Sequence, residues 1–132
     1  MICHWLSAQQ IDAEWESLRP YLERFERELQ LVSADVIRHD CRSGNKQLWS
    51  VYDTKLRGVV VTHVVESPKG RICEIYAACG SCTREGIRAV LGRLRMWAVG
   101  VGCVFMRIYG RKGWKRVLPE FQFVGIILEQ RL

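Results

Sequence analysis

The spacing of apolar residues changes along this chain, and that change restricts the folds it can adopt. From Ile11 to Leu29, apolar residues recur in steps of three and four, the spacing of one helical face. Pro20 interrupts this stripe. Because proline lacks an N–H and crowds the preceding turn, it predicts a kink or a split into two helices. Ser33 suits the N-cap of a following helix, Ala34 to about Cys41.

The middle of the chain has the composition of β-strands. Gln47–Tyr52, Gly58–Val65 and Arg71–Ala78 are rich in β-branched, aromatic and other apolar residues, and short turns separate them. Three such segments with short connections predict an antiparallel meander.

The last third returns to alternating elements. A helix capped by Thr83 or Ser81 and ended by Gly100 and Gly102 comes first. Its predicted inner face repeats in steps of four and three: Ile87, Leu91, Leu94, Ala98 and Val101. A strand, a short helix and a last strand are predicted next, at Cys103–Tyr109, Gly113–Phe121 and Val124–Leu132. This order predicts a mixed α/β layer whose ligands bind at the carboxyl ends of strands.

Length and composition favour one globular domain over residues 1–132. The chain is 48% hydrophobic and 26% charged, which excludes disordered, collagen-like and coiled-coil classes. Its longest apolar run, Met96–Met106, is shorter than the roughly 20 residues of a membrane span. The first residues lack a basic stretch followed by an apolar core, so we expect a cytoplasmic protein whose six cysteines are reduced.

Charge is distributed unevenly around a net value of +6. Residues 1–40 hold four bases and eight acids, whereas residues 84–132 hold ten bases and three acids. Such asymmetry is typical of a surface that binds a polyanion, although the two parts could instead pair across the fold.

Three segments near the C-terminus carry a resemblance to a known family. Gly102–Ile108, Gly110–Phe123 and Val124–Glu129 resemble the fifth strand, the following short helix with its aromatic corner, and the terminal strand of the GNAT acetyltransferase superfamily. More narrowly, Gln47-Leu48-Trp49 together with Gly113–Leu118 is similar to small bacteriophage proteins of this length. The resemblance implies a GNAT-like fold, with N-terminal helices before the meander, and a phage origin.

Members of that superfamily bind acetyl-CoA at the loop between the fourth strand and its helix. The loop has an Arg/Gln-x-x-Gly-x-Gly/Ala pattern, in which glycines let backbone amides approach the pyrophosphate. The resemblance places this site at Gly80, Ser81, Thr83, Arg84 and Gly86. Only Gly86 of the glycine pattern is present, and Glu85 adds a negative charge, so the loop is degenerate. An ordinary capped helix start, with Gly80 making a turn, is the other interpretation.

The resemblance also implies a base for the attacking amine and an acid for the leaving thiolate. The candidate base is Glu74 on the third predicted strand. The candidate acid is Tyr109 at the end of the predicted strand Cys103–Tyr109. The superfamily's tyrosine usually lies in the last short helix, where this chain has Phe121. Glu74 could instead face solvent, and Tyr109 could line the core.

The Cys79-Gly80-Ser81-Cys82 segment has the Cys-x-x-Cys spacing of zinc and redox sites. A zinc site needs two further ligands, and no second pair with suitable spacing exists in the sequence. Small apolar cysteines at a strand end are therefore the preferred interpretation, and we predict no metal. Cys73 and Cys103 alternate with apolar residues and are predicted to lie in the core.

A basic segment from Arg84 to Arg116 holds nine bases and one acid. Such a segment could bind nucleic acid through salt-sensitive phosphate contacts, or hold a CoA phosphate or an acidic protein. No nucleic-acid-binding motif accompanies it.

Three functions are consistent with these patterns. The first is a non-catalytic phage protein on a GNAT-like scaffold that binds a phage or host protein. It would be found in the host cytosol and, for instance as a virion component, in the phage particle. The second is an active acetyl-CoA-dependent N-acetyltransferase that modifies a host or phage target. The third is a basic nucleic-acid-binding accessory protein. An open groove between the strands ending near Ala78 and Tyr109 would favour a cofactor, whereas a groove filled by Trp114 or Arg84 would favour a binding protein.

Overall fold

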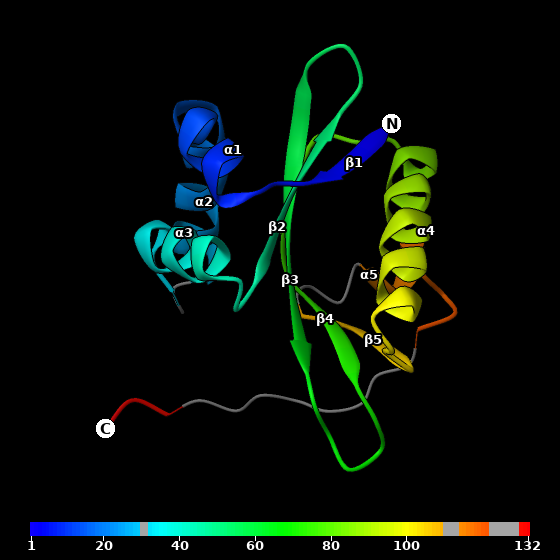
Figure 1. Ribbon diagram of the computed structural model, residues 1–132. Coiled ribbons are helices and arrows are strands. Elements are labelled where there is room, and N and C mark those ends of the chain that lie inside the picture. The colour runs from blue at the N-terminus through cyan, green and yellow to red at the C-terminus, as the bar shows by residue number, and fades with distance from the viewer. Residues whose placement is uncertain (30–31, 110–113, 122–129) are drawn as a thin grey trace.

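A computed structural model of the chain describes residues 1–29, 32–109, 114–121 and 130–132. Three helices lie on one side of a central sheet and a long helix lies on the other (Figure 1). The first side holds α1 (Ala8–Ala13), α2 (Trp15–Leu29) and α3 (Ala34–Ser43). The second holds α4 (Arg84–Gly100) and the short α5 (Trp114–Val117), whose neighbour Leu118 packs in the same core as α4.

The sheet has five strands in the spatial order β1-β2-β3-β4-β5. They are β1 (Ile2–Trp5), β2 (Gln47–Tyr52), β3 (Leu56–Val65), β4 (Ile72–Gly80) and β5 (Phe105–Ile108). The first four pair antiparallel, and β5 pairs parallel with β4 after the α4 crossover. The predicted meander and the mixed α/β class are confirmed.

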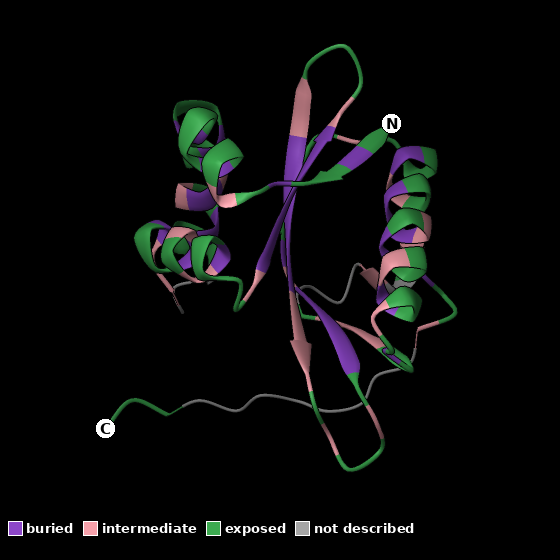
Figure 2. Cartoon of the chain, viewed as in Figure 1, coloured by how far each residue is buried: buried purple, intermediate pink, exposed green. Residues whose placement is uncertain are grey.

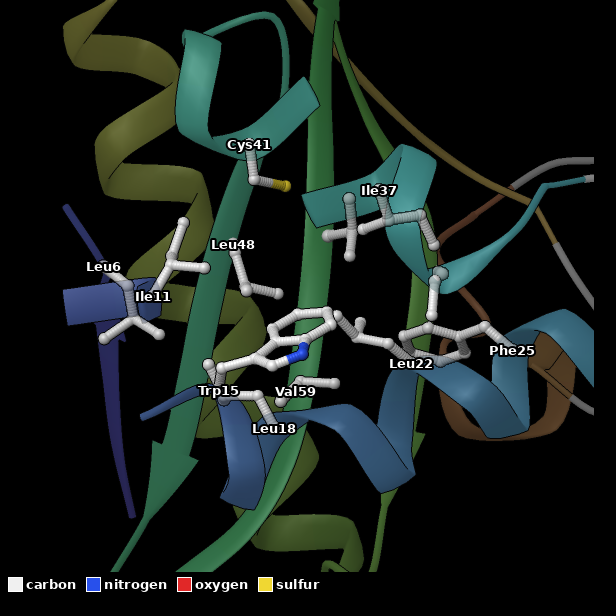
Figure 3. Close-up of a cluster of buried hydrophobic side chains, with 13 residues drawn as sticks. Leu6, Ile11, Trp15, Leu18, Leu22, Phe25, Ile37, Cys41, Leu48 and Val59 are labelled. Carbon is white, nitrogen blue, oxygen red and sulfur yellow. The ribbon is translucent and has the colours of Figure 1, made fainter. Parts of the chain in front are cut away.

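Apolar cores lie on both faces of the sheet. Figure 2 shows buried residues along the middle of the sheet and on the helix faces turned toward it. The helical stripe predicted from Ile11 fills the first core as far as Phe25, where it packs against Leu48 and Val59 (Figure 3). On the other face, Val90, Leu91 and Leu94 of α4 pack against Trp49, Val60 and Ile75. Cys73 and Cys103 are buried, as predicted.

Local capping explains where the helices begin. Ser7 and Gln10 form a reciprocal capping box at α1, and Ser33 accepts a hydrogen bond from the Val36 N–H at α3. Thr83, one of the two predicted caps, accepts from the Gly86 N–H at α4. Gly44 ends α3 in the left-handed conformation that glycine adopts without steric cost.

The N-terminal part differs from the prediction in two respects. Pro20 does not split the stripe into two helices: it is inside α2, and the break between helices lies at Glu14. The buried side chains of Leu18 and Leu22 flank Pro20 in sequence, and their burial offsets the proline cost of about 3 kcal/mol. The second difference is β1, which the sequence pattern did not predict. Its four residues are too few to show a period in the sequence, and pairing with β2 supplies its hydrogen bonds.

Three predicted boundaries in the last third also change. The strand predicted over Cys103–Tyr109 is limited to β5, and the short helix ends at Val117. Residues 130–132 of the predicted final strand are exposed and have no strand structure, and residues 122–129 lie outside the described part. No helix among the described residues is long and apolar enough to cross a membrane.

The pairing of β3 with β4 gives a stability prediction, because Gly58 and Gly80 are cross-strand partners. A Cβ on Gly58 would lie 2.4 Å from the Cys79 carbonyl oxygen, so alanine cannot fit without a backbone shift. We expect Gly58→Ala to lower the free energy of unfolding by about 1–3 kcal/mol. A Cβ on Gly92 in α4 would meet nothing within 4 Å, so Gly92→Ala should raise it by about 0.5–1 kcal/mol. Urea unfolding followed by circular dichroism measures both, and equal midpoints for the two variants would contradict the packing argument.

Candidate active site between the fourth and fifth strands

A groove opens where β4 and β5 stop pairing. Their parallel register ends at Ile75 and Ile108, although β4 continues beside β3 as far as Gly80. Among the described residues, no strand pairs with the β5-facing edge of β4 beyond this point. The resulting cavity has a volume of about 370 Å³, a size typical of small-molecule sites.

The walls of the groove come from both layers. Ile87, Val90 and Leu91 of α4 line one side, and Arg24, Phe25 and Glu28 of α2 lie at the other. Tyr109 and Trp114 also line the groove. Trp114 forms part of the wall and leaves the cavity open.

Glu74, Arg107 and His63 meet on three neighbouring strands beside this groove. Glu74 on β4 is the register partner of His63 on β3 and of Arg107 on β5. One Glu74 oxygen, Oε1, lies 4.0 Å from His63 Nδ1, and the other, Oε2, lies 3.9 Å from an Arg107 guanidinium nitrogen. Glu74 is 8% exposed, and its Oε2 atom is buried without a hydrogen-bond partner among the described residues.

Tyr109 connects this charged group to the groove, because it lines the cavity and interacts with Glu74. The Glu74 carboxylate is the main cause that raises the pKa of the Tyr109 hydroxyl above its ordinary value, and partial burial acts in the same direction. Arg107 acts in the opposite direction and does not reverse the shift. The structure therefore brings together Glu74 and Tyr109, the two residues predicted as base and acid.

The sequence reasoning did not identify His63 and Arg107. A signal for His63 was present: the Ser67–Gly70 turn fixes the hairpin register and places His63 opposite Glu74. Arg107 could not be placed in this way, because a parallel register depends on how the α4 crossover packs.

The predicted cofactor residues lie together at the end of β4 and the start of α4, but their glycines have packing roles. Gly80 does not make a turn: it is in β4, and a Cβ there would lie 2.4 Å from the Arg57 carbonyl oxygen. Gly86 is buried, and a Cβ on it would lie 3.3 Å from Thr83 Oγ1 and 3.4 Å from Met1 Cε. Both glycines are therefore explained by contacts within the protein.

The polar groups of this loop are partly engaged. The Ser81 N–H donates to the Arg57 carbonyl at 3.0 Å, and the Gly86 N–H donates to the Thr83 hydroxyl at 3.0 Å. Arg84 and Glu85 are exposed in the first turn of α4, so a positive and a negative side chain sit side by side there.

The two cysteines of the Cys-x-x-Cys segment belong to different cores. Cys79 packs against the cluster beneath α1–α3, whereas Cys82 packs against the cluster beneath α4. Burial raises the pKa of both thiols. Within the described ranges, no group of three or more His, Cys, Asp or Glu residues could hold a metal ion.

Several bases of the Arg84–Arg116 segment have partners within the fold. Arg88 and Arg95 each lie 3.2 Å from a Glu120 carboxylate oxygen, and Arg93 lies over the Trp49 ring. Arg84 and Arg116 are exposed. Arg111, Lys112 and the Lys115 side chain are outside the described part.

Ion pairs between described residues join groups of the same layer. Asp12 of α1 pairs with Arg38 and Arg42 of α3. In the same way, Glu120 pairs with Arg88 and Arg95 of α4. These pairs lie within residues 12–42 or within residues 88–120, and none of them joins the acidic residues 1–40 to the basic residues 84–132.

Comparison with known proteins shows which solved structures share this fold. Neither a protein-family model nor a curated protein sequence matches the chain. Among solved structures, a probable acetyltransferase has a TM-score of 0.74 at 11% identity, over 100% of this chain and 96% of its own. Aminoglycoside acetyltransferase meta-AAC0020 from an uncultured soil metagenomic sample, in complex with trehalose, has a TM-score of 0.72 at 12% identity, over 99% and 95%.

A third similar structure is a predicted acetyltransferase with acetyl-CoA from Clostridium acetobutylicum. It has a TM-score of 0.70 at 13% identity, over 98% of this chain and 95% of its own. The predicted phage origin, virion role and macromolecular partners are not addressed by these likenesses and stay predictions. The likenesses and the observed strand order show that this chain has the GNAT acetyltransferase fold.

Proposed function

We propose that the chain is an N-acyltransferase that takes its acyl group from an acyl-CoA thioester. The single observation that carries the proposal is the position of Tyr109, which lines the groove and donates its backbone N–H to the carbonyl of Ile75, the residue after Glu74. The Glu74 carboxylate also raises the pKa of its hydroxyl. A proton donor beside a ligand cavity and a carboxylate behind it are the two groups that amide formation from a thioester requires.

The groove fits the acyl and pantetheine part of such a donor. Its walls are mostly apolar, and the edge of β4 beyond Ile75 presents backbone groups that an amide-containing arm can hydrogen-bond. The similar structure from Clostridium acetobutylicum holds acetyl-CoA, which supports the assignment of ligand class. When bound, the thioester supplies an activated acyl carbon.

The pyrophosphate end fits less well. The two loop glycines serve internal packing, and the Gly86 N–H already donates a hydrogen bond to the Thr83 hydroxyl. Glu85 places a negative charge in the first turn of α4. The positive end of the helix dipole remains there, and Arg84 adds a cation. We infer that this chain holds its donor mainly through the groove.

The residues divide the proton transfers between them. Glu74 accepts one proton from the acceptor ammonium, and the neutral nitrogen then forms a bond to the acyl carbon as the carbon–sulfur bond breaks. Tyr109 donates its proton to the departing sulfur and regains a proton from the nitrogen of the new amide. Tyrosine is protonated at neutral pH, and the raised pKa of Tyr109 keeps it so, which leaves it a proton to donate.

A non-catalytic binding role on the same scaffold is the competing hypothesis, and the degenerate loop is the feature that favours it. The two differ in one respect: a binding module would accept the thioester without transferring its acyl group. A role in nucleic-acid binding has less support, because four of the six described bases between Arg84 and Arg116 contact acidic or aromatic side chains.

The first prediction of this proposal concerns the transfer of an acyl group to an amine. Wild-type protein incubated with acetyl-CoA and amines of three classes (peptide α-amines, lysine side chains and aminosugars) should form an acetylated product detectable by mass spectrometry. Tyr109→Phe should lower kcat about 100-fold, since one general acid is lost, and leave the calorimetric Kd for acetyl-CoA unchanged.

Tyr52→Phe is the matched control, because Tyr52 lies at the end of β2 away from the groove wall and should keep wild-type kcat. Binding of acetyl-CoA without product from any amine would establish the binding module instead. Absence of heat at millimolar acetyl-CoA would remove the acyl-CoA proposal.

The second prediction tests the contact between Glu74 and Tyr109. Glu74→Gln replaces the carboxylate by a neutral amide, so the pKa of Tyr109 should fall toward its ordinary value near 10. Ultraviolet titration of the phenolate, with Tyr109→Phe subtracted to identify the signal, measures this change. An unchanged titration in Glu74→Gln would show that the carboxylate does not act on the hydroxyl.

The third prediction concerns the phosphate end. Removing the negative charge with Glu85→Gln should tighten acetyl-CoA binding several-fold at low salt, and the gain should shrink as salt rises. Glu26→Gln, at an exposed position on α2, is the control and should leave the Kd unchanged. Calorimetry at 20 and 300 mM salt measures both. A gain that persists at high salt would mean that the charge of Glu85 is not the cause.

A further inference from the structure

Glu74 is a buried acid that has to release any proton it accepts. Its side chain is 10% exposed, and its Oε2 atom has no hydrogen-bond partner among the described residues. A base in this position needs a second group to pass the proton to water, since a protonated Glu74 cannot begin another cycle.

Within the described part of the chain, three groups lie near the Glu74 carboxylate, and they differ in their ability to carry a proton. Arg107, from β5, stays protonated at all ordinary pH values and cannot accept one. Tyr109, which follows β5, has a raised pKa and faces the groove. His63, from β3, has an imidazole, the side chain that gains and loses a proton near neutral pH.

The position of His63 links the buried carboxylate to solvent. The two residues are direct cross-strand partners, with 4.0 Å between Nδ1 and Oε1, and the His63 side chain is 35% exposed. This gap exceeds a hydrogen bond by about 1 Å, and catalytic contacts commonly shorten when substrate binds. A small rotation of either side chain would be enough to bring the two atoms within hydrogen-bond distance.

We propose that His63 is a positioning and relay residue that carries the proton from Glu74 to bulk water. This inference rests on the proposed function. An acceptor ammonium loses one proton to Glu74, Glu74 passes it to Nδ1 of neutral His63, and the imidazolium releases a proton to water. The neutral amine then attacks the acyl carbon, and its second proton replaces the one that Tyr109 gives to the departing sulfur. The carboxylate, the imidazole and the phenol are all restored, and no other reactant is needed. Arg107 attracts Glu74 Oε2 and leaves Oε1 directed toward His63.

The kinetic test replaces His63 by an uncharged residue of similar size. His63→Gln should lower kcat about tenfold with acetyl-CoA and a responsive amine, leave KM unchanged, and alter the pH profile of kcat on its acidic limb. Added imidazole should restore kcat, because it can accept the proton from Glu74 in place of the missing ring. His4→Gln, at an exposed position on β1, is the matched control and should have wild-type kinetics. Wild-type kcat and pH profile in His63→Gln would overturn the relay.

A second measurement does not depend on activity. The ¹³C signal of the Glu74 carboxyl, recorded over a pH series, should show a step that arises from the neighbouring imidazole. That step should disappear in His63→Gln and persist in His4→Gln. Absence of the step in the wild-type protein overturns the relay whatever the kinetics. A step in a protein that transfers no acyl group would support the pairing and remove the proposed function, so the two failures are distinguishable.

Discussion

The separation of β4 from β5 is the constraint on which the rest of the site depends. The α4 crossover lets β5 pair in parallel with the first half of β4, and α5 follows β5 on the α4 side of the sheet. Pairing therefore ends at Ile75 and Ile108, whereas β3 holds β4 in place as far as Gly80. A strand edge supported on one side and open on the other forms a ligand cavity without requiring a special loop.

The same sheet places charge next to that opening. Cross-strand neighbours on one face lie about 5 Å apart, so His63, Glu74 and Arg107 come within reach of one another on three successive strands. Burial makes this arrangement consequential, because a carboxylate removed from water interacts strongly with the few groups near it. The shifted pKa of Tyr109 is one result, and it connects the electrostatics of the sheet to the wall of the groove.

The glycines and cysteines show how a motif can mislead when it is interpreted without packing. Gly80 and Gly86 match a phosphate-binding pattern in part, yet a strand backbone leaves no room for a Cβ on the first, and the helix cap and Met1 leave little room for one on the second. Cys79 and Cys82 have metal-site spacing, but they belong to cores on opposite faces of the sheet. In both cases a residue type was explained by its tertiary neighbours and not by its sequence spacing.

The sequence by itself determined the helix faces, the cap at Ser33 and the three-strand meander, because these depend on contacts between residues close along the chain. It offered Thr83 as one of two caps for α4, and its resemblance to a known family implied the GNAT-like order of elements. It also identified Glu74 and Tyr109 as candidates. Only the tertiary structure decided that these two meet, that His63 and Arg107 join them, that β1 forms an edge strand, and that α2 continues through Pro20. Each of these depends on the parallel register set by the crossover, on partners distant in sequence, or on burial that outweighs a local preference.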